Sequence, residues 1–222
     1  MHTIARFLAA ANLERPLKVG IDGIDAAGKT RFADHLATVL ASHDRQVVRV
    51  SLDSFHNPRQ QRYARGSLSP EGYFLDSFNL TRLVQDVLEP LSGTPPFTIR
   101  WAAFDHITDQ PVKAEPEQIQ ANAVVLLDGI FLCREELRPY WDVVIFLDIP
   151  SELSLQRART RDLALLGSAA VIEERYLQRY LPAQRFYLKT CLPVKRADFV
   201  INNRDPLHPR LVKSPSSGPE QD

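Results

Sequence analysis

The chain has 222 residues, enough for one α/β domain with a substantial core. Its 27 lysines and arginines balance its 27 aspartates and glutamates, which excludes a long-range attraction to nucleic acid or to an anionic membrane surface. The two cysteines are too few for a disulfide scaffold or a metal cluster. No apolar run is long enough to span a membrane, and Arg6 and Glu14 interrupt the region where a signal peptide would be apolar. We therefore expect a cytoplasmic protein.

The first predicted elements are a helix and a strand. Residues 3–14 place apolar side chains at helical spacing, on the face formed by Ile4, Phe7, Leu8 and Ala11. Pro16 separates this helix from the apolar run 17–21. That run contains the β-branched residues Val19 and Ile21, which favour a buried strand.

Residues 23–30, GIDAAGKT, match the phosphate-binding pattern G-x-x-x-x-G-K-[ST] at every position. The glycines let the backbone curl so that its N–H groups point at an anion, and the next helix adds the positive end of its dipole. Lys29 is expected to reach the β- and γ-phosphates, and the hydroxyl of Thr30 to bind Mg²⁺. The predicted ATP-binding residues are therefore Gly23, Ile24, Asp25, Ala26, Ala27, Gly28, Lys29 and Thr30.

A polar cluster follows the second predicted strand, residues 47–50. Its sequence, SLDSFH at 51–56, falls at the carboxyl end of a parallel strand, where open α/β sheets bind ligands. Asp53 is our candidate general base, because its carboxylate could accept a proton from a hydroxyl or help to order Mg²⁺. In the alternative interpretation, Asp53 only caps the turn through Ser54 and His56.

Residues 54–120 are predicted to form an insertion that binds the second substrate. Within it, 79–89 predict a helix. Residues 97–101 predict a strand, paired as a hairpin with residues near 111–113. Flat aromatic side chains can stack on a nucleobase and a histidine can hydrogen-bond its edge, although each could instead belong to local core. The candidate residues are Tyr73, Trp101 and His106.

Two later strands carry functional signals. The run 123–127 ends in Asp128, and an acid in this position approaches the Mg²⁺ shell in phosphate-loop enzymes. The run 143–147 precedes a helix with a dense cationic patch, formed by Arg157, Arg159 and Arg161. Guanidinium groups can clamp a transferring phosphate, unless the patch is only a solvated helix face paired with neighbouring acids.

The rest of the chain completes the predicted sheet. A helical stretch at about 170–190 is interrupted at Pro182, and 198–201 predict a fifth strand. Residues 213–222 predict a disordered tail. Strands alternating with helices predict an α/β fold, with a parallel sheet covered on both faces, in one domain over residues 1–212.

Seven segments carry a resemblance to a known family: GIDAAGKT at 23–30, SLDSF at 51–55, DSFN at 76–79, DHITD at 105–109, LLDGIFL at 126–132, ARTRD at 158–162 and LPVKRADFVI at 192–201. In this order they resemble the uridine kinase family of P-loop kinases, which also includes phosphoribulokinase-like members. The resemblance implies a five-stranded parallel sheet in the order 2-3-1-4-5, with helices on both faces. It also implies a hairpin insertion at about 54–120 and an arginine-bearing lid at about 155–170.

The resemblance also assigns roles to individual residues. Asp53 matches the catalytic acid, Arg161 a lid arginine, and Trp101 and His106 positions that contact the nucleoside. Asn202 and Asn203 follow the last strand, in a loop that often contacts adenine. Three positions depart from the family pattern: Asp128 replaces the usual glutamate, His56 a common tyrosine, and Ala158 a second lid arginine.

The leading interpretation is an ATP- and Mg²⁺-dependent kinase that phosphorylates the 5′-hydroxyl of a pyrimidine nucleoside. The predicted catalytic residues are Asp53, Lys29 and Arg161. The predicted acceptor-binding residues are Asp53, His56, Tyr73, Trp101, His106 and Arg161. Beyond the loop, ATP is expected to contact Arg157, Asn202 and Asn203, and Mg²⁺ is expected to be bound by Thr30, Asp53 and Asp128.

Two alternatives stay open. The acceptor could be another small molecule, such as a sugar phosphate, pantothenate or nicotinamide riboside, because Arg59, Arg62 and Arg65 could bind a phosphorylated one. A nucleotide-switched hydrolase or binding protein is disfavoured, because the chain has neither the guanine-specifying Asn-Lys-x-Asp motif nor an obvious glutamine near the loop. A homo-oligomer is compatible with each interpretation.

Overall fold

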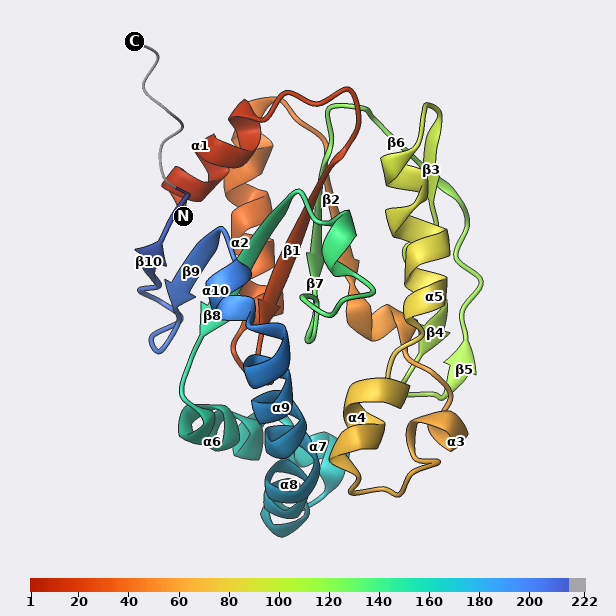
Figure 1. Cartoon of the computed structure of the whole chain (residues 1–222), viewed down its shortest axis with the longest axis vertical. Helices are drawn as coiled ribbons and strands as arrows, with labels where there is room; N and C mark the ends of the chain where they lie inside the picture. Colours follow the sequence, from red (N-terminus) through yellow and green to blue (C-terminus); the bar gives the residue numbers. More distant parts are fainter. Residues whose placement is uncertain (216–222) are drawn as a thin grey trace.

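The computed structural model describes residues 1–215, without the side chains of residues 165 and 166, and is built around a six-stranded sheet. The strands are β1 (Leu17–Gly23), β2 (Val47–Ser51), β7 (Val124–Asp128), β8 (Val143–Asp148), β9 (Phe199–Asn202) and β10 (Arg210–Lys213). They lie in the order β10-β9-β8-β1-β7-β2 (Figure 1). All neighbours are parallel except β9 and β10. The predicted α/β class with a parallel sheet is confirmed.

The five parallel strands lie in the order 2-3-1-4-5 along the sheet, as the resemblance implies. The count of five is too low for the whole sheet, because β10 adds an antiparallel strand at the edge. All four residues of β10 are exposed, so no burial pattern marks this strand in the sequence. Its last residue, Lys213, is also the first residue of the predicted disordered tail, and residues 216–222 of that tail lie outside the described residues.

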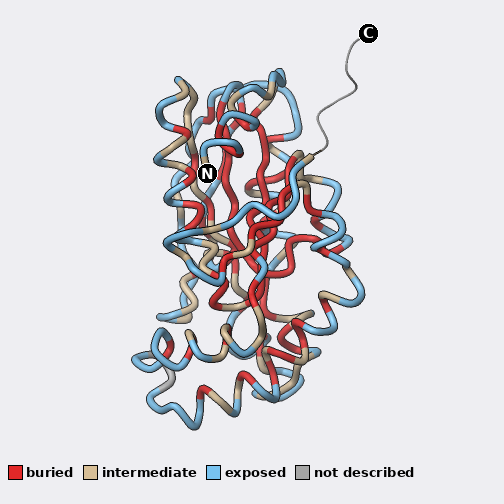
Figure 2. The backbone as a smooth tube through the Cα atoms, turned by 90° about the vertical axis from the view of Figure 1, so that its left-hand side faces the viewer, coloured by how far each residue is buried: buried red, intermediate tan, exposed pale blue. Residues whose placement is uncertain are grey.

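Both faces of the sheet are covered, because successive side chains of each strand point to opposite sides. In β7, Val124 and Leu126 belong to a core shared with α1 (His2–Ala10) and α2 (Lys29–Leu40). Val125 and Leu127 belong to the opposite core. That core includes side chains from α5 (Leu80–Leu83), the π-helical turn Val84–Leu88 and α9 (Leu181–Cys191). Figure 2 shows the buried strands running through the centre, between largely exposed helices.

The predicted insertion lies between β2 and β7. Its helical elements are the 3-10 turn Leu52–Phe55, α3 (Arg59–Arg62), α4 (Pro70–Asp76), α5 with its π-helical turn, and the 3-10 turn Pro90–Ser92. Its strands are β3 (Phe97–Ile99), β4 (Phe104–Asp105), β5 (Gln110–Pro111) and β6 (Glu117–Ile119).

The predicted hairpin partner was wrong. Strand β3 pairs with β6, with Phe97 opposite Ile119, whereas β4 and β5 form a separate two-residue ladder. Phe97, Ile99 and Ile119 are buried together in the core, while residues 111–113 are exposed and begin with a proline, which has no N–H to donate.

The C-terminal half contains α6 (Ser151–Arg161), α7 (Leu163–Leu166), α8 (Ala169–Arg175), the π-helical turn Tyr176–Tyr180, α9 and α10 (Pro193–Arg196). The predicted interruption of the helical stretch 170–190 is present, but it lies just before Pro182, as the π-helical turn Tyr176–Tyr180, and the proline itself is in the first turn of α9. The leading helix was also predicted too long, since α1 ends at Ala10. None of the described helices combines the length and the apolar character needed to cross a membrane.

Candidate active site

The phosphate loop connects β1 to α2, as the sequence predicts. Gly28 precedes α2 with a φ of +90°, and a Cβ at this position would lie 3.0 Å from Nδ2 of Asn203, so the turn requires glycine. Nζ of Lys29 donates to the carbonyl oxygens of Gly23 and Ile24, each at 3.0 Å. The ammonium group of Lys29 is therefore held against the backbone of the phosphate loop.

An acidic site adjoins the end of this loop. Oγ1 of Thr30 donates to Oδ2 of Asp128 at 2.7 Å, and Nη2 of Arg49 donates to the other oxygen of Asp128 at 2.6 Å. Asp128 is buried, and Arg49 also pairs with Asp34. A hydroxyl and a carboxylate in contact are the hard oxygen donors that Mg²⁺ prefers, so Thr30 and Asp128 fit the predicted Mg²⁺ site.

Two residues predicted to contact ATP hold the loop in place. Nδ2 of Asn203 donates to the carbonyl oxygen of Ala27 at 2.6 Å. Arg157 donates from Nη1 to the carbonyl oxygen of Ala26 at 3.1 Å and from Nη2 to that of Asn203 at 3.0 Å. Together they tie the loop to the segment after β9 and to α6. Asn202 instead accepts a hydrogen bond from its near neighbour, the N–H of Arg204.

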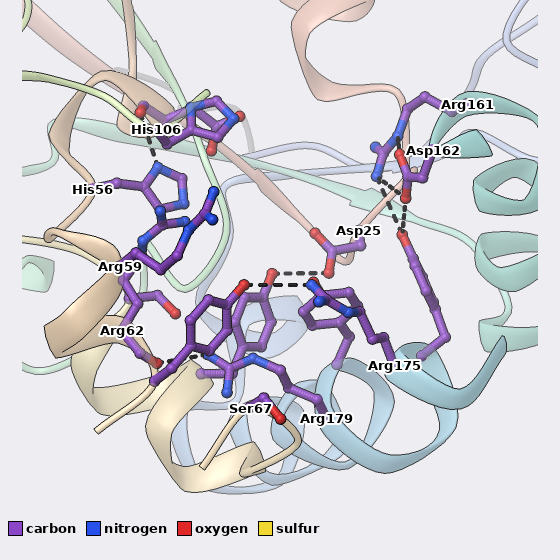
Figure 3. A pocket seen from close by; sticks show the side chains of 16 residues that line it. Asp25, His56, Arg59, Arg62, Ser67, His106, Arg161, Asp162, Arg175 and Arg179 are labelled. Carbon is purple, nitrogen blue, oxygen red and sulfur yellow. Dashed lines mark hydrogen bonds and ion pairs between the residues drawn. The ribbon is translucent and has the colours of Figure 1, made fainter. Parts of the chain in front are cut away.

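Two cavities adjoin one another beside the loop. The loop cavity, of about 610 Å³, is lined by residues of the motif together with Asp128 and Arg157. The arginine cavity, of about 520 Å³, lies between the insertion and helices α6 and α8 and takes its name from five lining arginines (Figure 3). The residues that line both cavities are Asp25, Asp53, His56, Tyr73, His106, Arg161 and Asp162. A third, smaller cavity of about 250 Å³ borders the loop at Gly28, Asn203 and Pro206.

Asp53 lies where the two large cavities meet. It belongs to the 3-10 turn that follows β2, and its own N–H is bonded to Oγ of Ser51 at 3.3 Å. Within the part of the chain that the structure describes, the Asp53 carboxylate is exposed and makes no hydrogen bond. The turn is thus capped by Ser51, and the Asp53 carboxylate is left to face the cavities.

His56 is a neutral imidazole at neutral pH. The pKa of His56 is lowered from 6.5 to about 4, mainly because burial disfavours the imidazolium, while Asp53 opposes this and His106 and Arg62 add to it. Nδ1 of His56 lies 2.9 Å from the carbonyl oxygen of Asp53, which can only accept, so Nδ1 carries the proton and Nε2 is an acceptor. The ring stacks on that of His106, with centroids 4.6 Å apart and planes at 26°.

This lowered pKa predicts a pH-dependent stability. Below about pH 6.5 an unfolded chain protonates this histidine, whereas folded His56 stays neutral until about pH 4, so the folded state loses stability as the pH falls through this window. As the pH falls from 7.5 to 4, the unfolding free energy of the wild type should decrease by up to about 3 kcal/mol more than that of His56→Gln. Urea unfolding of both proteins between pH 7.5 and pH 4 measures the difference, and two parallel curves would contradict the assignment.

Asp25 connects the phosphate loop to the arginine cavity. Its Oδ2 accepts hydrogen bonds from the hydroxyl of Tyr73 at 2.9 Å and from Nε2 of Gln184 at 2.6 Å. Burial raises the pKa of Asp25, and the charge of Lys29 partly offsets this. Tyr73 was predicted to contact the second substrate, but its buried hydroxyl also positions a residue of the loop. This link was not foreseen, because Gln184 is 159 positions from Asp25.

The three arginines of α6 have different surroundings. Arg161 lines both cavities and bonds to Asp162 through Nε at 2.6 Å, and its Nη2 donates to the hydroxyl of Tyr176 at 3.2 Å. Arg159 pairs with Glu173 on α8, away from the cavities. Only Arg157 and Arg161 are therefore placed to act at the site.

The structure does not bring Trp101 to the site. Its side chain is 46% exposed and is absent from the residues that line either large cavity. Sequence reasoning also missed the contribution of the C-terminal helices to the arginine cavity, made by Arg175, Tyr176, Arg179 and Tyr180. The sequence spacing could have predicted this contribution. Arg175 and Arg179 are four positions apart, as are Tyr176 and Tyr180, so each pair shares one helix face.

Comparisons with known proteins agree with this geometry. The family model described as Phosphoribulokinase / Uridine kinase family matches residues 19–206. A uridine kinase of Lactobacillus helveticus is 25% identical over 197 residues, which cover 85% of this chain and 87% of that protein. Uridine kinase-like protein 5 of Arabidopsis thaliana is 26% identical over 87% of this chain, which spans only 40% of the length of that protein.

A solved structure gives the same result for the fold. The structure of a possible uridine kinase from Bacillus stearothermophilus has a TM-score of 0.70 and 25% sequence identity to this chain, and the match covers 89% of this chain and 95% of that one.

Proposed function

Because the chain belongs to the phosphoribulokinase/uridine kinase family of P-loop kinases, we propose that it transfers the γ-phosphoryl group of ATP to a hydroxyl of a small acceptor in the arginine cavity. The observation that carries this proposal is that the loop cavity and the arginine cavity adjoin at Asp53. A donor phosphate on the loop and an acceptor hydroxyl could then reach the same carboxylate, which is the positioning that phosphoryl transfer requires.

On the donor side, the loop amides and Lys29 bind the triphosphate, while Thr30 and Asp128 hold Mg²⁺. When bound, Mg²⁺ supplies positive charge that neutralises the phosphate oxygens. The small cavity at Gly28 and Asn203 would take the adenine, beside the loop that the Asn203 amide supports.

On the acceptor side, Asp53 orients the hydroxyl and accepts its proton as the bond to phosphorus forms. Arg161 stabilises charge on the transferring group. Its contacts with described residues use Nε and Nη2, which leaves Nη1 for this role. The predicted lid at about 155–170 would exclude water, since an open site would hydrolyse ATP.

A pyrimidine nucleoside is the first candidate acceptor, because relatives of this chain are named uridine kinases. The stacked rings of His56 and His106 give a flat surface at the junction of the cavities, on which a base could stack. A different hydroxylated acceptor is the second candidate, supported by the five arginines that line the cavity.

The test is an acceptor panel. The protein is incubated with ATP and Mg²⁺ and, one at a time, with nucleosides, sugar phosphates and hydroxy acids, and ADP is measured. We expect ADP to form only when a suitable acceptor is present. ADP formation at full rate without any acceptor would contradict the proposal and favour a hydrolase.

A further inference from the structure

One end of the arginine cavity is formed by three arginines around a single tyrosine ring. The guanidinium carbons of Arg62, Arg175 and Arg179 lie 5.7, 6.0 and 4.9 Å from the ring centroid of Tyr63. Arg62 comes from the insertion, whereas Arg175 and Arg179 come from the C-terminal helices. Figure 3 shows Arg62 on one side of the cavity and the helix of Arg175 and Arg179 on the other, with the Arg179 side chain reaching toward Arg62. We call Arg62, Arg175 and Arg179 the Tyr63 cluster.

The cluster carries more positive charge than the chain neutralises. Arg179 is 2% exposed and donates to the carbonyl oxygens of Arg62, Gly66 and Ser69. Nη1 of Arg175 donates to the hydroxyl of Tyr63 at 3.4 Å. Neither Arg175 nor Arg179 pairs with a carboxylate among residues 1–215. Burial lowers the pKa of Arg179, and the like charge of Arg175 lowers it further.

Arg62 is the one arginine of the Tyr63 cluster with a carboxylate partner among the described residues. Its Nη2 reaches Asp109 at 3.0 Å, the one carboxylate that pairs with the Tyr63 cluster among the described residues. Its Nε is buried and has no hydrogen-bond partner in the described part of the chain. A buried donor without a partner costs free energy, and so does a buried charge without a counterion. An anion in the cavity would supply the missing counterion, whereas the buried Nε of Arg62 lies out of its reach.

Among the described residues, none of the three carboxylates that line the arginine cavity pairs with the Tyr63 cluster. Asp25 accepts from Tyr73 and Gln184, and Asp162 is paired with Arg161. Asp53 lies at the junction with the loop cavity. The cluster thus concentrates guanidinium charge in the lining of the arginine cavity, and guanidinium groups recognise phosphate and carboxylate.

We propose that the Tyr63 cluster binds an anionic group of the acceptor, a phosphate or a carboxylate, so that the acceptor is a hydroxylated phosphate ester or hydroxy acid. This inference rests on the proposed function, since it assumes that the arginine cavity holds the acceptor. Two alternatives make a different prediction. If the acceptor is a neutral nucleoside, or if the cluster is purely structural, no anion binds to the cluster.

The first test is binding of inorganic phosphate. The full chain is saturated with Mg²⁺ and a non-hydrolysable ATP analogue, which occupies the phosphate loop, and phosphate is titrated calorimetrically. Arg175→Gln should weaken phosphate binding by about ten- to a hundred-fold, the effect of losing one charge-assisted contact. Arg185→Gln is the matched control, because Arg185 is exposed on α9 and does not line the cavity, so its loss should change nothing. No phosphate binding, or equal binding by Arg175→Gln and wild type, would overturn the proposal.

The second test uses matched pairs of acceptors, each a hydroxyl compound with and without a phosphate or carboxylate. The charged member should have a kcat/KM at least about ten-fold higher, and Arg175→Gln should remove that advantage through KM. If neutral nucleosides are phosphorylated as fast as any charged compound and Arg175→Gln leaves KM unchanged, the anion site is refuted while the proposed kinase activity is supported. If phosphate binds at the cluster but no acceptor yields ADP, the anion site stands and the proposed function fails.

Discussion

Replacing Asp53 by asparagine is expected to lower kcat by about two to four orders of magnitude, the usual contribution of a positioned general base. Asparagine keeps the size of the side chain but cannot accept the proton of the acceptor hydroxyl. The Kd for ATP should be nearly unchanged, because the loop contacts of Lys29 and Thr30 remain in place. Single-turnover kinetics and nucleotide titration of the same preparation measure the two quantities.

Asp44→Asn is the matched control for this experiment. Asp44 is an exposed aspartate before the amino end of β2, whereas Asp53 follows the carboxyl end of that strand. The φ of Asp44 is 50°, a value that asparagine tolerates. It should keep the wild-type rate. If Asp53→Asn also keeps that rate, Asp53 has no part in proton transfer and the junction between the cavities needs another base.

The second large effect is expected for Lys29→Met. The methionine fills the space of the lysine but removes the ammonium that the loop carries over Gly23 and Ile24. The phosphoryl group then loses a positive charge in the transition state, which should lower kcat by about two to three orders of magnitude and also weaken ATP binding. Lys189→Met, on the exposed face of α9, should change neither kcat nor the Kd for ATP.

The two variants should impair different functions, so their results distinguish the role of the donor side from that of the acceptor side. Asp53→Asn should spare the affinity for the donor, whereas Lys29→Met should not. Equal damage to ATP binding by both variants would mean that Asp53 acts on the bound nucleotide. An unaltered Lys29→Met enzyme would mean that the loop takes no part in the reaction.

The donor side of the site was predictable because its chemistry is local in sequence. Eight consecutive residues set the turn, the ammonium and the hydroxyl of the phosphate loop, and a buried strand ending in Asp128 brings the carboxylate to Thr30. Strand and helix spacing was enough to predict the parallel sheet. The edge strand β10 was missed, since its exposed residues carry no pattern of burial.

The acceptor side could not be predicted to the same extent, because it is assembled from distant segments. Arg179 meets the insertion through hydrogen bonds to residues more than 100 positions away, and no local pattern specifies such contacts. Trp101 was predicted to contact the nucleoside as a flat aromatic side chain of the insertion, yet it does not line either cavity.

The central claim is that a phosphoryl group passes between two cavities that adjoin at Asp53. The most direct measurement follows the γ-phosphorus of ATP by ³¹P NMR during incubation with Mg²⁺, the enzyme and the acceptor panel. The signal should move to a phosphomonoester of one acceptor, in equal amount to the ADP formed and with little free phosphate. Accumulation of inorganic phosphate in its place, at the same rate with and without acceptors, would contradict the claim.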